Sequence, residues 1–188
     1  MTKVGEAPVY SSRLLEAGKA LETPATFLQN LSRIFTKKDQ LCVFNPTTHQ
    51  HIATGITKAD FTRLQKIDSR SGLGSSDLET ARRILDSAGI ATDKLGVKVL
   101  INLSQLVGSG KMSSADAQKL SKISSGALQE KLIDLHEKKS ALAEKILQLG
   151  SDRLQAKLVD LVAKKPELAE RIVQLKSETL QEKLAELH

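Results

Sequence analysis

One eight-residue pattern occurs three times in the last third of the chain, and it constrains the fold more than any other feature. The copies are LQEKLIDL at 128–135, LQAKLVDL at 154–161 and LQEKLAEL at 180–187, each 26 residues after the one before. Residues 128–153 and 154–179 are identical at 15 of 26 positions. A fixed period of this length is typical of helical repeat proteins, in which each unit stacks on the next.

Two related segments, LAEKILQL at 142–149 and LAERIVQL at 168–175, alternate with these three copies. All five segments have apolar residues at helical spacing, but one continuous helix would not keep them on one face. Residues that favour helix starts or breaks fall between the segments, at Ser140, Gly150–Ser151, Pro166 and Ser177. The sequence therefore predicts five short helices, arranged as an α-solenoid-like repeat or a helical stack.

The two ends of the repeated region depart from the pattern. In DAQKLSKI at 116–123, Asp116 replaces the leading Leu, and Ala185 replaces the larger apolar residue of the earlier copies. Lower apolarity at both ends is typical of caps that close a stack. An array that continues beyond His188 would explain the second departure equally well.

The chain before the repeats is expected to be mainly helical, with one β-hairpin over about residues 41–53. LCVF and HQHIATG have strand character, and Asn45–Pro46 marks the turn between them. If NPTT is the whole loop, Phe44 pairs with His49 and Cys42 with His51. Helical spacing appears at 27–35 (FLQNLSRIF), and Ser76 with Glu79 forms a capping-box signature.

We therefore predict an all-α fold with one hairpin, organised in three parts. Residues 1–25 form a polar N-terminal lead, and residues 26–125 form a mixed, mainly helical domain. Residues 126–188 form the helical repeat, which is packed on that domain or continuous with it.

Cys42, His49 and His51 form the one cluster of the sequence with nucleophilic or metal-binding character. On one face of a hairpin they would supply three zinc ligands, or a Cys–His pair for hydrolysis. No carboxylate is placed beside them by spacing. The turn VGSGKMS at 107–113 lacks the residues of a phosphate-binding loop, and too few carboxylates surround it for calcium. We expect no catalytic residue, no cofactor and no bound metal; a zinc protein or Cys/His hydrolase is the second alternative.

The repeated basic positions are Lys131, Lys145, Lys157, Arg171 and Lys183. Each lies at the edge of an apolar stripe, where its stem can cover the core while its charge stays in water. On the long segments an acid follows three residues later, which predicts ion pairs within one helix. The other interpretation is a row of cations that contacts an acidic protein partner.

The net charge of +6 lies entirely in residues 1–126, since the repeated region is neutral. Its densest groups there are Lys37–Lys38 and Arg82–Arg83. These four residues carry the first alternative function, nucleic-acid binding through the N-terminal region. Because the surplus is diffuse, we expect such binding to be weak and salt-sensitive.

The sequence as a whole favours a non-enzymatic protein–protein interaction module: an adaptor, a scaffold or a leaderless secreted effector. Repeats offer extended surfaces, and no family resemblance emerges from the residues. We expect no membrane span and no cleaved signal peptide, because the N-terminal residues lack an apolar core. A cytoplasmic location is expected, and export by a leaderless route is compatible with it. The oligomeric state stays open.

Overall fold

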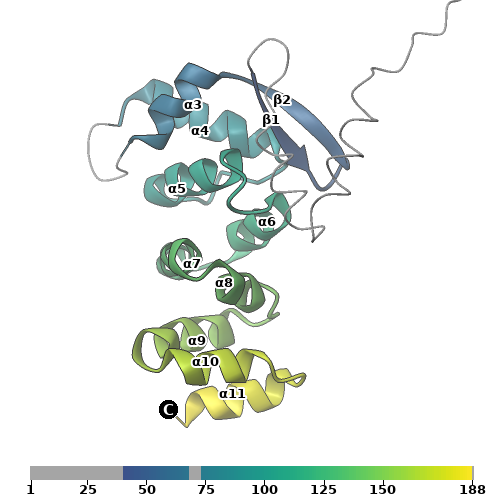
Figure 1. The fold of residues 1–188 in the computed structure, drawn as a ribbon, viewed down its shortest axis with the longest axis vertical. Coiled ribbons are helices and arrows are strands. Elements are labelled where there is room, and N and C mark those ends of the chain that lie inside the picture. Colours follow the sequence, from purple (N-terminus) through teal and green to yellow (C-terminus); the bar gives the residue numbers. More distant parts are fainter. Residues whose placement is uncertain (1–39, 68–72, 188) are drawn as a thin grey trace, which may run out of the picture.

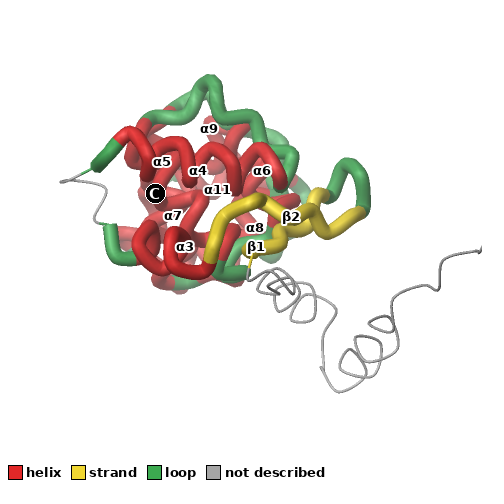
Figure 2. Tube along the Cα trace, turned by 90° about the horizontal axis from the view of Figure 1, so that it is seen from above, coloured by secondary structure: helices red, strands yellow, loops and turns green. Residues whose placement is uncertain are grey.

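The computed structural model describes residues 40–67 and 73–187, and within these ranges the chain is mostly helical. The described part contains nine helices and one antiparallel two-stranded hairpin. They are arranged along one long axis, with the hairpin at one end and α11 at the other (Figure 1). Seen along that axis, the hairpin lies to one side of the helices (Figure 2). The predicted mainly helical class with one hairpin is confirmed. The predicted lead over 1–25 and helix at 27–35 lie outside the described residues.

The hairpin consists of β1 (Gln40–Asn45) and β2 (Gln50–Thr57). The helices that connect it to the repeated segments are α3 (Lys58–Gln65), α4 (Ser75–Ser87), α5 (Val97–Gly108) and α6 (Ser114–Lys122). The repeated segments form α7 (Gly126–Lys138), α8 (Ser140–Leu147), α9 (Asp152–Lys164), α10 (Pro166–Val173) and α11 (Glu178–Glu186). No helix in the described ranges has the length and apolar character that crossing a membrane requires.

The hairpin forms where the sequence predicts it, but its register differs. Its loop spans residues 46–49 rather than 45–48. As a result Phe44 lies opposite His51, and Cys42 lies opposite Ala53. The predicted pairs of Phe44 with His49 and of Cys42 with His51 are therefore wrong by two residues.

Asn45, the last residue of β1, explains why the loop begins one residue later than expected. Its Oδ1 accepts hydrogen bonds from the Thr47 and Thr48 N–H groups at 3.0 and 3.2 Å. Its Nδ2 donates to the Ser87 carbonyl at the end of α4 at 3.2 Å. The side chain thus organises the turn and also ties it to α4, as Asn often does in loops.

α5 is the centre of the core at the hairpin end. Eight of its twelve residues are buried, and it contacts β1, α3, α4, α6 and α7. Its last residue, Gly108, lies directly against the ring of Phe61 from α3. A Cβ at Gly108 would lie 2.5 Å from the Phe61 Cε2 atom, so glycine permits this close approach.

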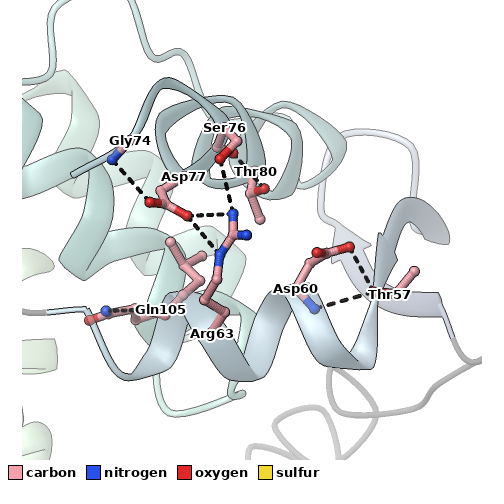
Figure 3. Close-up of polar contacts among 9 residues, drawn as sticks. Thr57, Asp60, Arg63, Gly74, Ser76, Asp77, Thr80 and Gln105 are labelled. Atoms are coloured by element: carbon pink, nitrogen blue, oxygen red, sulfur yellow. Dashed lines mark hydrogen bonds and ion pairs between the residues drawn. The ribbon is translucent and has the colours of Figure 1, made fainter. Parts of the chain in front are cut away.

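A charged cluster joins α3 to the start of α4 (Figure 3). Arg63 donates to Asp77 Oδ1 from Nε at 3.0 Å and from Nη2 at 2.6 Å. The other oxygen of the buried Asp77 carboxylate accepts from the Gly74 N–H at 3.0 Å. Asp77 therefore caps α4, and the predicted capping box of Ser76 and Glu79 is wrong. The buried charge is stable here because a guanidinium and a helix N-terminus both satisfy it.

The repeated segments form separate short helices, as predicted, rather than one rod. Ser125, Ser151 and Ser177 cap the long helices α7, α9 and α11, each accepting a hydrogen bond from the N–H three residues later. Only one residue separates each long helix from the short helix after it. After α7 this residue is Lys139, with φ −144° and ψ 70°. After α9 it is Lys165, with φ −142° and ψ 72°.

The ends of the repeated region do not behave as the predicted caps. α6, which contains the degenerate copy, contacts β1, α5, α7 and α8, so it lies inside the structure. α11 exposes Leu180, Leu184 and Leu187. An outer surface with three leucines is not the polar face that a terminal cap requires.

The first prediction compares one position in the middle helix and the last helix. Leu158 in α9 is fully buried, whereas its counterpart Leu184 in α11 is 36% exposed. We expect Leu158→Ala to lower the free energy of unfolding by about 2–5 kcal/mol, and Leu184→Ala to lower it clearly less. Denaturant melts of both variants measure the difference. Equal losses would show that α11 is covered on both sides in solution.

A second prediction concerns Gly108. We expect Gly108→Ala to lower the free energy of unfolding by about 1–3 kcal/mol, because the added methyl group collides with Phe61. Gly126, at the start of α7, has open space around the same position, so Gly126→Ala is a matched control. The control should be neutral or slightly stabilising in the same melts. Equal effects would contradict the close approach.

Candidate interaction site

The five basic residues of the repeated pattern differ in their contacts, and two of them form ion pairs between helices. Lys131 on α7 lies with its Nζ 2.6 Å from Asp160 Oδ1 on α9, and Lys157 Nζ on α9 lies 2.7 Å from Glu186 Oε1 on α11. These pairs join residues 29 apart. The predicted pairs within one helix, such as Lys131 with Asp134, are therefore wrong. Each lysine connects its own long helix to the next one.

The side chains of the other three basic positions, Lys145 on α8, Arg171 on α10 and Lys183 on α11, are exposed. None of them has an ion-pair or hydrogen-bond partner within residues 40–67 and 73–187. Lys145 lines two adjoining hollows of the surface.

We name the surface between the short helices the α8–α10 groove. It consists of two adjoining hollows of about 490 and 500 Å³ that share Lys145 and Gln174. Leu142 and Leu149 on one side, and Val173 on the other, contribute apolar surface. The groove runs across two successive helix pairs, so its shape depends on how they stack.

The groove carries a surplus of positive charge. Its lining contains four lysines, Lys138, Lys139, Lys145 and Lys176, and two glutamates, Glu170 and Glu178. Both glutamates are engaged: Glu170 pairs with Lys139 at 2.7 Å, and Glu178 Oε1 accepts from the Gly150 N–H at 2.9 Å. The remaining three lysines have no acidic partner in the described part of the chain. The lining as a whole therefore has two more positive than negative side chains.

A second hollow, of about 520 Å³, lies on the long-helix side between α7 and α9. Leu135, Val159 and Val162 contribute to its lining. Lys131 and Asp160, which also line it, pair with each other at 2.6 Å. Asp134 and the lysines Lys138 and Lys139 line it as well, and both of these lysines also line the α8–α10 groove.

Sequence reasoning missed a set of buried glutamines: Gln129, Gln155 and Gln181, each less than 5% exposed. Their Nε2 atoms donate to carbonyls at the end of the preceding short helix or loop, for example from Gln155 to Leu149 O at 2.8 Å. Each therefore satisfies backbone groups that a helix end leaves without partners. The signal was the invariant Gln after the first Leu of each octapeptide, a polar residue beside a core position.

The Cys42, His49 and His51 cluster is not assembled as a site. His49 lies in the exposed loop with φ 54°, while the His51 ring lies against the Phe44 ring in a tilted arrangement, with ring centroids 5.3 Å apart. Burial raises the pKa of the Cys42 thiol, which disfavours the nucleophilic thiolate. Burial also lowers the pKa of His51. In the described ranges no three His, Cys, Asp or Glu side chains are grouped to hold a metal ion.

The structure describes two of the four residues of the nucleic-acid alternative. Arg82 and Arg83 are exposed on α4, and the guanidinium of Arg83 lies over Gly55 of β2. Lys37 and Lys38 lie outside the described residues.

His136 is a buried titratable group on α7. It is 3% exposed, and its Nε2 lies 3.7 Å from Glu144 Oε1 of α8 without a hydrogen bond. Burial lowers the pKa of this imidazole, and the nearby Asp116 carboxylate opposes the shift in part. The residue 26 positions later is Val162, so the same place in the next unit is apolar.

The third prediction follows from this histidine. Since the folded protein holds His136 with a lowered pKa, the unfolded chain binds a proton more readily near the ordinary value of 6.5. The free energy of unfolding should therefore fall as the pH drops below that value. In His136→Val this loss should be smaller. Denaturant melts between about pH 7 and pH 5 measure it, with His49→Asn in the exposed loop as control. The same pH dependence in His136→Val and the wild type would contradict the assignment.

Comparison with known proteins identifies no relative of this chain. No protein-family model matches the chain, and no curated protein or solved structure matches it. The candidate site therefore depends on the contacts, charges and shape described above.

Proposed function

We propose that this chain is a non-enzymatic protein–protein interaction module that binds an acidic segment of a partner in the α8–α10 groove. The observation that carries the proposal is the unbalanced charge of this groove. Lys138, Lys145 and Lys176 have no acidic partner in the described structure, whereas both lining glutamates are already engaged.

The groove also supplies apolar surface for a partner. Leu175, at its edge, is 37% exposed, and Leu149 and Val173 lie beside it. A surface that combines apolar side chains with unpaired lysines suits a segment with alternating acidic and apolar side chains. Charge would guide the encounter and orient the segment, while apolar contact would hold it.

The proposal assigns partner binding to fewer of the repeated basic residues than the sequence analysis did. Lys131 and Lys157 form ion pairs within the stack, so we assign them to its stability rather than to a partner. Lys145 lies at the meeting point of the two hollows, so we assign it the central role. A non-catalytic function is supported by the buried, high-pKa thiol of Cys42 and by the separation of His49 from it.

In this proposal the helical repeat acts as a scaffold or adaptor surface. The same surface would serve in the cytoplasm or after export by a leaderless route. Successive helix pairs with similar caps present similar side chains side by side, which suits an extended partner.

The fourth prediction tests the groove directly. A fluorescent peptide of alternating Glu and Leu should bind the full chain, and binding should weaken about tenfold in the double variant Lys145→Glu, Lys176→Glu. Lys122→Glu, an exposed lysine outside the groove, is the matched control and should bind as the wild type does. Fluorescence anisotropy measures all three.

Two outcomes of that experiment would contradict the proposal. One is equal binding to the double variant and the control, since the groove lysines would then contribute nothing. The other is displacement of the peptide by duplex DNA at similar concentration, which would favour the nucleic-acid alternative.

A further inference from the structure

The leucines on the outer face of α11 are far more exposed than the corresponding leucines of α9, the preceding long helix. In α9, Leu154, Leu158 and Leu161 are between 0% and 5% exposed. Their counterparts in α11, Leu180, Leu184 and Leu187, are 54%, 36% and 74% exposed. Contiguous exposed apolar side chains of this kind mark interaction surfaces. α11 is the last helix that the structure describes (Figure 1).

The chain itself shows which helices pack on a long helix. α9 contacts the long helices α7 and α11 and the short helices α8 and α10, so each long helix contacts the long helix before it and the short helices beside it. Each contact between successive long helices includes an ion pair between a lysine of the earlier helix and an acid of the later helix. These pairs are Lys131 with Asp160 and Lys157 with Glu186. The acid stands each time in the sequence Leu-x-[Asp/Glu]-Leu.

Lys183 on α11 occupies the position of Lys131 and Lys157. It is exposed and has no ion-pair or hydrogen-bond partner among the described residues. The outer face therefore offers both parts of the contact that the stack uses twice: a leucine surface and a cation at its edge.

We propose that the outer face of α11 binds an amphipathic helix of another protein, with a Leu-x-[Asp/Glu]-Leu sequence whose acid pairs with Lys183. Binding would reproduce the contact of α9 with α7, with the leucines buried between the two helices. This is a helix-in-groove mode, distinct from the extended acidic segment of the α8–α10 groove.

Other occupants fit less well. Residues 1–39 contain no Leu-x-[Asp/Glu]-Leu sequence. In a second copy of the chain, Asp160 and Glu186 already pair within their own stack. The third such sequence, which contains Asp134, is on α7, and α7 lies between α5 and α9. A helix from a different protein can present this sequence with an acid that has no other partner.

The probe for the test is a labelled synthetic peptide with the sequence of α9, DRLQAKLVDLVAK, titrated onto the full chain and followed by fluorescence anisotropy. We expect Lys183→Glu to weaken binding about fivefold, the factor of an exposed ion pair. Leu184→Ala should weaken it by at least about tenfold. Lys122→Glu, an exposed lysine on α6 outside both proposed surfaces, is the control and should leave binding unchanged.

A charge exchange separates a direct pair from a general charge effect. The peptide DRLQAKLVKLVAK, with lysine in place of the acid, should bind Lys183→Glu better than it binds the wild type. Unchanged binding of both peptides to Lys183→Glu and Leu184→Ala would overturn the proposal. So would self-association of the full chain through this face, seen as a concentration-dependent mass in sedimentation that Leu184→Ala abolishes. Peptide binding that appears only after removal of residues 1–39 would assign the face to that segment instead.

Discussion

The burial of α5 is the constraint on which the rest of the structure depends. A two-stranded hairpin has too little apolar surface to be stable alone, and short helices need packing partners for the same reason. α5 provides that surface for both, because it contacts β1, α3 and α4 on one side and α7 on the other. Gly108 allows the closest of these contacts, against Phe61. The hairpin end and the helical stack therefore share one continuous apolar core.

Beyond α5 the stack is held by the same three contacts in succession: buried leucines, a buried glutamine and a lysine–acid pair. The leucines give most of the stabilisation, since apolar burial scales with area. The glutamines give specificity, because Gln129, Gln155 and Gln181 bond to the end of the preceding helix. Each leaves its Oε1 buried without a partner in the described structure. A buried polar atom without a partner costs free energy, so these glutamines serve alignment more than stability.

Most of the helical architecture could be predicted from local sequence, whereas the pairings could not. Serine caps and apolar spacing located the short helices, because both signals act within one turn of helix. The hairpin register was wrong because Asn45 bonds both to its own loop and to Ser87, a residue far away in the chain. The lysine pairs were wrong for a similar reason. Lys131 can reach an acid on its own helix or on the next one, and only the stacking decides between Asp134 and Asp160. The α8–α10 groove arises between helix pairs, so no single segment encodes it.

The one-residue links at Lys139 and Lys165 have a mechanical consequence. The φ and ψ angles of one residue set the orientation of each long helix relative to its short helix, and the two helices also pack on each other. The links between the pairs are longer, residues 148–151 and 174–177. The α8–α10 groove is lined by residues of both links, Gln148 and Leu149 from the first and Gln174, Leu175 and Lys176 from the second. A segment bound in the groove would therefore contact both links, and it would favour one orientation of the helix pairs relative to each other.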